Sequence, residues 1–173
     1  ERRFHESRGE PLSVFLERAN EELQEELAAV DNYLTCLVVR PAGERLEYVN
    51  AAHTEPIFRR AGSRTASVLA PKGADDYKGP PLGLEDIAST ARQLSFRMGP
   101  GDILLVYTDG LVEGKNARGE LYGMERLLAS VGRAPERKIS ARVVLEGIMA
   151  DFDAWTDPSK VADDLTAIVL VRK

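Results

Sequence analysis

Three aspartates lie directly beside the two most apolar segments of the chain. Asp109 follows residues 103–107, and Asp163 and Asp164 precede residues 165–171. A short, continuous apolar run is typical of a strand buried on both faces. If two such strands lie side by side and antiparallel, their carboxylates come together at one edge. Carboxylates that close repel each other, and a hard divalent cation such as Mg²⁺ or Mn²⁺ relieves that repulsion.

Each aspartate also has a plain structural interpretation, because Asp is common in turns and helix caps. For one isolated aspartate at a strand end, that interpretation is the better one. Two such positions, beside the two most apolar strands, make a metal site about as good an explanation. Gly110 follows Asp109 and would let the backbone approach a ligand closely. Composition and spacing carry the argument as far as a metal–carboxylate hypothesis.

Other reactive side chains fit structural roles better. Cys36 lies in a predicted buried strand, where a core cysteine is more common than a nucleophile. His53 could act as a general acid, but a histidine hydrogen-bonded to loop backbone is more common. Asp151 and Asp153 fit the end of a helix, and Asp157 precedes a proline, which is a turn signal. One cysteine and two histidines leave no His/Cys zinc set, and no glycine-rich phosphate loop occurs.

The composition is that of an ordinary globular domain. The chain has 173 residues, of which 43% are hydrophobic and 29% charged, with a net charge of −5. Residues 1–32 hold nine acids and four bases, so the excess negative charge lies there. A solvated helix face explains it better than a docking surface for a basic partner. No basic patch with aromatics indicates nucleic-acid binding, and no apolar run or leader indicates a membrane segment. A single cysteine fits the reducing cytoplasm.

Hydrophobic periodicity predicts an α+β protein with largely antiparallel sheets and helices packed outside them. The first helix is amphipathic, with glutamates on its outer face. The loop at 61–84 is expected to lie beside a site rather than between domains. The predicted elements are a helix at 11–30, a hairpin at 33–50, a strand at 56–60, a second hairpin joining 90–98 to 103–107, helices at 123–130 and 139–153, and a strand at 165–171.

Several short segments, taken in order, resemble the metal-dependent protein phosphatases (PPM). The similarity is to the bacterial branch that regulates sigma factors and sporulation, the RsbU/SpoIIE type. Each segment is weak evidence alone, but the ordered set is specific and covers essentially the whole chain. The segments are 33–35 (Tyr-Leu-Thr), 47–53 (Glu-Tyr-Val-Asn-Ala-Ala-His), 81–84 (Pro-Leu-Gly-Leu), 100–113 (which contains Tyr-Thr-Asp-Gly), 122–127 (Tyr-Gly-Met-Glu-Arg-Leu) and 163–166 (Asp-Asp-Leu-Thr).

The resemblance implies a single PPM-type domain over residues 1–173, a β-sandwich of antiparallel sheets flanked by helices. It implies hydrolysis of phosphoserine or phosphothreonine by a metal-activated water, with two Mn²⁺ or Mg²⁺ ions and no further catalytic side chain. The implied substrate is a regulatory protein such as an anti-anti-sigma factor. A preceding sensor or receiver domain is also expected, and a homodimer is one candidate assembly, with the oligomeric state left open. The implied metal ligands are Asp109 and Asp163, and the implied supporting residues are Gly110, Asp164, Asn50 and His53.

The chain departs from the family pattern in two places. Ala52 stands where the family usually has glycine, and no segment supplies the family's first metal motif, an Asp followed by a Gly-His-Gly-like turn. The resemblance therefore implies half of a two-metal site and missing strands. We expect residues 1–173 to be the C-terminal part of a larger phosphatase, with Glu1 in the interior of its chain. Strands supplied by a second copy are an alternative, and so is a non-catalytic PPM-like module that acts through protein contacts.

Overall fold

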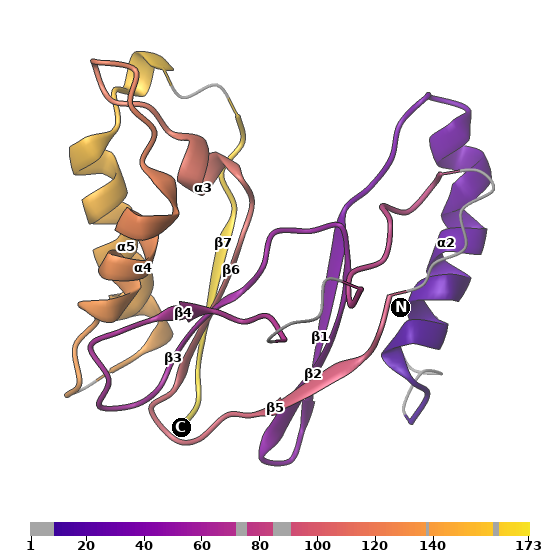
Figure 1. The fold of residues 1–173 in the computed structure, drawn as a ribbon, viewed down its shortest axis with the longest axis horizontal. Helices are drawn as coiled ribbons and strands as arrows, with labels where there is room; N and C mark the ends of the chain where they lie inside the picture. The colour runs from indigo at the N-terminus through magenta and orange to yellow at the C-terminus, as the bar shows by residue number, and fades with distance from the viewer. Residues whose placement is uncertain (1–8, 72–75, 85–90, 138, 161–162) are drawn as a thin grey trace. The chain divides into compact units, whose positions relative to one another are not determined.

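A computed structural model describes residues 9–71, 76–84, 91–137, 139–160 and 163–173. The chain divides into two compact units (Figure 1). Unit 1 comprises Glu1–His53 and Pro71–Arg97, and unit 2 comprises Thr54–Ala70 and Met98–Lys173. Among the described helices, none combines the length and apolar character that a membrane crossing needs.

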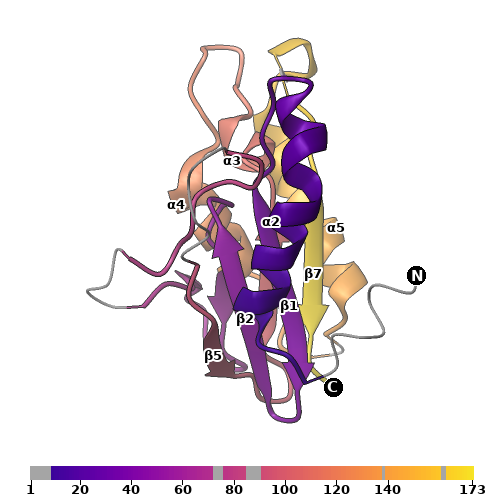
Figure 2. The same ribbon diagram turned by 90° about the vertical axis from the view of Figure 1, so that its right-hand side faces the viewer.

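Unit 1 is a helix on a three-stranded antiparallel sheet with the strand order β1-β2-β5. The helix α2 lies along the sheet (Figure 2) and packs against β2. Its apolar stripe meets the inward side chains of the strand, so Leu16 and Val49 are both fully buried. The predicted first helix and first hairpin are confirmed, with small shifts in their ends. The elements are α2 (Leu12–Ala28), β1 (Cys36–Ala42), β2 (Arg45–Ala51) and β5 (Leu94–Arg97).

Unit 2 is a four-stranded antiparallel sheet with the order β4-β3-β6-β7, and α4 and α5 cover one face (Figure 1). The predicted strands at 56–60, 103–107 and 165–171 and both late helices are confirmed. The elements β4, α3 and η1 are not predicted by periodicity, because each is too short to show a period. The elements are β3 (Ile57–Arg59), β4 (Ser67–Val68), β6 (Ile103–Tyr107), α3 (Gly110–Glu113), α4 (Gly123–Gly132), α5 (Ala141–Trp155), η1 (Pro158–Lys160) and β7 (Ala167–Val171).

The core of unit 2 lies between β6 and the two long helices. Ser140 starts α5, where its side chain accepts a hydrogen bond from Val143 N. Val144, Ile148 and Phe152 then recur at helical spacing and bury one face of α5 against the core. Burying side chains of this size contributes about 1.5–3 kcal/mol each. The core therefore provides a firm base for the loop that follows β6.

The predicted second hairpin is wrong. Residues 94–98 do alternate in burial as expected, but β5 pairs with β2, whereas β6 pairs with β3 and β7. The turn between β5 and β6 is tied to the end of β3 instead. The buried carboxylate of Asp102 accepts hydrogen bonds from the backbone nitrogens of Ala61 and Gly99 and from the Arg60 guanidinium. A turn signal predicts a reversal, but it does not say which strand the chain joins afterwards.

Two strands are less buried than their apolar sequences predict. In β7 only Val169 is buried, while Ile168 and Leu170 are 53% and 38% exposed. The strand lies at the end of the sheet order, whereas the central β6 is buried almost throughout. In β1 no residue is fully buried, and Tyr33 and Leu34 lie before the strand and are exposed. An apolar run alone does not distinguish a central strand from an edge strand.

Candidate metal centre

The predicted pairing behind the metal hypothesis is present, because β6 and β7 are antiparallel neighbours. Tyr107, the last residue of β6, is paired with Ala167, the first residue of β7. Asp109 follows β6 by two residues, and Asp163 and Asp164 precede β7 by four and three. All three aspartates therefore leave the sheet of unit 2 at the same end.

Thr108 extends the pairing beyond the strands. Its backbone N–H donates to Thr166 O at 3.0 Å. Its hydroxyl oxygen accepts a hydrogen bond from Thr166 N at 2.9 Å and lies 3.3 Å from Asp164 O. The segments that carry the acidic residues are therefore linked at the residue directly before Asp109. The sequence alone assigns Thr108 no role, and its local signal is a hydroxyl directly after a buried strand.

Gly110 makes the second close approach between these segments. A Cβ atom at this position would lie 2.8 Å from Asp164 O and 3.6 Å from Asp163 O. Real Cβ atoms do not approach backbone oxygens at 2.8 Å, so the position requires glycine. The absence of a side chain at Gly110 leaves room for the backbone of Asp163 and Asp164. The close approach of the Gly110 backbone to a ligand stays a prediction.

The carboxylates of Asp109 and Asp163 are both exposed. Asp109 caps α3 by accepting a hydrogen bond from Gly110 N at 3.1 Å, and Asp163 accepts one from Asp164 N at 2.8 Å. The plain structural interpretation therefore holds for Asp109, but one hydrogen bond leaves most acceptor sites of a carboxylate free. Within the described ranges, no group of three or more His, Cys, Asp or Glu side chains could hold a metal. The two aspartates fit Mn²⁺ or Mg²⁺ as a partial set of hard oxygen ligands.

Asn50 and His53, the two predicted supporting residues, lie in unit 1 and hold one loop. The Asn50 side chain accepts a hydrogen bond from His53 N at 2.8 Å and donates one to His53 O at 3.1 Å. The Thr35 hydroxyl lies 3.2 Å from His53 Nδ1. Between them, Ala52 has φ +55°, a left-handed conformation that favours glycine. This backbone explains why a glycine would suit the position that Ala52 occupies.

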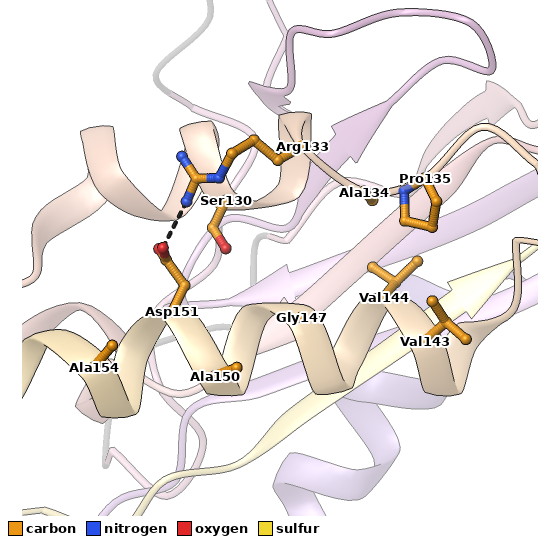
Figure 3. A pocket seen from close by; sticks show the side chains of 10 residues that line it. All are labelled: Ser130, Arg133, Ala134, Pro135, Val143, Val144, Gly147, Ala150, Asp151 and Ala154. Carbon is orange, nitrogen blue, oxygen red and sulfur yellow. Dashed lines mark hydrogen bonds and ion pairs between the residues drawn. The ribbon is translucent and has the colours of Figure 1, made fainter.

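The remaining reactive side chains have structural contacts. Cys36 is partly buried, and burial raises the pKa of its thiol, so it is not an activated nucleophile. Asp151 accepts hydrogen bonds from Tyr122 Oη and the Arg133 guanidinium at the rim of a pocket of about 360 Å³ between α4 and α5 (Figure 3). Asp157 accepts two hydrogen bonds from Ser159, as a turn residue does, and they lower the pKa of its carboxyl.

The raised pKa of Tyr107, at the end of β6, leads us to expect a loss of stability at alkaline pH. Burial, with a smaller effect of Glu55, raises the pKa of its phenol to about 12. The unfolded chain ionises first, near pH 10, so the folded state loses stability as the pH rises from about 10 to 12. We expect Tyr107→Phe to unfold in urea at a midpoint that depends less on pH in this window. An unchanged pH slope would contradict this role.

Comparisons with known proteins agree with the fold. A family model for stage II sporulation protein E (SpoIIE) matches residues 2–173. Protein IcfG of Synechocystis is 28% identical over 139 residues, which cover 78% of this chain and 20% of that protein. The chain thus spans about one fifth of this curated relative.

Two solved structures have similar folds. The RsbU and RsbW domains of Rv1364c from Mycobacterium tuberculosis match with a TM-score of 0.67 and 22% identity, over 99% of this chain and 44% of that one. The manganese-presoaked phosphatase domain of SpoIIE from Bacillus subtilis matches with a TM-score of 0.55 and 12% identity, over 89% of this chain and 65% of that one. At these identities the likeness establishes the fold. The α+β class with antiparallel sheets, as in PPM phosphatases, is confirmed.

Proposed function

Because the chain belongs to the stage II sporulation protein E (SpoIIE) family, we propose that it is part of a metal-dependent phosphatase. The reaction is hydrolysis of phosphoserine or phosphothreonine on a regulatory protein. The observation that carries the proposal is that Asp109 and Asp163 leave neighbouring antiparallel strands at the same end. The solved phosphatase domain of SpoIIE, which was presoaked with manganese, supports it through the fold.

Asp109 and Asp163 are the residues that would hold a divalent ion. Such ions, when bound, activate water and neutralise the charge of phosphoryl oxygens. The chain's own contribution is to fix the two carboxylates on a rigid base. The buried strand β6 supports Asp109, and the contact between Gly110 and Asp164 fixes the neighbouring segment. Asp164 is proposed as a supporting residue rather than a ligand, and Asn50 and His53 are proposed to support the loop of unit 1 in which they lie.

The proposed substrate is a small phosphorylated regulator of the anti-anti-sigma type. The structure of Rv1364c, which contains RsbU and RsbW domains in one chain, is consistent with a place in such signalling. We further propose a cytoplasmic protein with a preceding sensor or receiver domain, and a homodimer as a candidate assembly. These partners rest on the family resemblance and on the family match.

The test uses the complete protein that contains residues 1–173. Purified protein is stripped of metal with EDTA and then assayed for phosphate release from a phosphoserine peptide. We expect no release without metal and recovered release after Mn²⁺ is added, with Ca²⁺ as the matched divalent control. Peptide binding without phosphate release under all conditions would favour the non-catalytic binding module and would refute the phosphatase proposal.

A further inference from the structure

The last link between β6 and β7 is made by a side chain rather than by backbone groups alone. We propose that Thr108 is a positioning residue whose hydroxyl sets the relative placement of Asp109 and Asp163 for metal binding. This inference rests on the proposed function, because it assigns Thr108 a part in the same site. Thr108 itself contacts neither reacting atoms nor metal in this proposal.

The hydrogen bonds of Thr108 define what its hydroxyl can do. A hydroxyl has one proton to donate and two lone pairs that accept. Thr108 Oγ1 accepts from Thr166 N at 2.9 Å and donates either to Asp164 O at 3.3 Å or to Thr166 O at 3.4 Å. In a regular antiparallel ladder, Thr166 N would donate to the backbone carbonyl of Thr108. Here the Thr108 hydroxyl takes the place of that carbonyl.

These bonds connect the two candidate ligands through a short covalent path. Thr108 directly precedes Asp109, and Asp164, whose carbonyl faces the hydroxyl, directly follows Asp163. Asp163 in turn accepts a hydrogen bond from Asp164 N at 2.8 Å. A movement of the segment before β7 away from Thr108 would therefore change the placement of Asp163 relative to Asp109. Groups that orient metal ligands typically affect metal affinity by about 10–100-fold.

A purely structural role predicts a different result. Thr108 is partly buried and Thr166 is exposed, so water can replace the lost hydrogen bond at small cost in stability. Valine has the same branched shape as threonine and lacks the hydroxyl, whereas serine keeps the hydroxyl and lacks the methyl group. The two substitutions therefore separate hydrogen bonding from packing.

The experiment compares Thr108→Val with Thr108→Ser in the complete protein, with Thr65→Val as a threonine-to-valine control in an exposed turn. We measure amide exchange at Thr166, the Kd for Mn²⁺ by calorimetry, and kcat and KM on a phosphoserine peptide. For Thr108→Val we expect faster exchange and a Kd raised by about tenfold. We also expect kcat to recover at high Mn²⁺, with KM unchanged. Thr108→Ser and Thr65→Val should match the wild type.

The outcomes separate this inference from the proposed function. If the wild type hydrolyses the peptide and Thr108→Val keeps its Mn²⁺ affinity, the positioning role is refuted while the phosphatase proposal survives. An equal loss of affinity in Thr108→Ser would assign the effect to packing and would also refute the role. A wild type that binds no Mn²⁺ would overturn both.

Discussion

Asp109→Asn is expected to lower kcat for phosphate release by a factor on the order of 10³ while the protein stays folded. Asparagine has nearly the same shape as aspartate, but its amide is a much weaker ligand for a hard cation than a carboxylate. The fold should tolerate the change, because asparagine caps helices as well as aspartate does. Its amide oxygen can still accept the hydrogen bond that Asp109 takes from Gly110 N.

The matched control for this variant is Asp153→Asn. Asp153 is an exposed residue of α5, so the substitution makes the same change in net charge away from the candidate site. We expect this control to keep wild-type kcat, and we expect only Asp109→Asn to weaken Mn²⁺ binding in calorimetry. Wild-type turnover by Asp109→Asn at limiting Mn²⁺ would show that Asp109 has been assigned wrongly.

The fold could be predicted from the sequence where a local pattern coincides with a tertiary role. Val144, Ile148 and Phe152 recur at helical spacing because one face of α5 meets the core, so the helix was predictable. The partners of each strand could not be predicted, because strand pairing is decided by contacts between residues that are distant in sequence. Leu94–Arg97 and Ile103–Tyr107 are separated only by a turn, yet they join different sheets. The exposure of Ile168 shows the same limit, since an edge strand and a central strand can be equally apolar.

The candidate site was predictable only in part. Asp109 and Asp163 can be proposed from the sequence because a charged residue directly beside a buried strand stands out, and their role as ligands stays a prediction. The hydrogen bonds of Thr108 could not be predicted, because they depend on the register that pairs Tyr107 with Ala167. The need for glycine at position 110 was attributed to a ligand, whereas the structure places the carbonyl of Asp164 there. A hydroxyl directly after a buried strand marks the position of Thr108 but not its partners, because contacts between segments more than 50 residues apart cannot be read from the local sequence.

Gly110→Ala is expected to destabilise the protein although alanine is the better helix former. Gly110 is the first residue of the four-residue helix α3, where helix propensity favours alanine by less than the roughly 1 kcal/mol that applies inside a helix. The new Cβ would lie 2.8 Å from Asp164 O, a backbone atom that cannot rotate away. Overpacking of this kind typically costs about 1–3 kcal/mol, so the clash should outweigh the propensity. The free energy of unfolding, measured in urea, should therefore fall.

Gly147→Ala is the matched control, because it places the same methyl group in α5 where nothing beyond the adjoining residues and the helix's own backbone lies within 4 Å. The free energy of unfolding of this variant should rise by about 0.5–1 kcal/mol, since alanine is preferred to glycine inside a helix. If the free energy of unfolding falls for Gly110→Ala and rises for Gly147→Ala, the difference is due to the clash at position 110. Because the clash separates Asp109 from the segment of Asp163, Gly110→Ala should also weaken Mn²⁺ binding at least as much as Thr108→Val. A stabilised Gly110→Ala variant with unchanged Mn²⁺ affinity would mean that the two segments are not held in close contact.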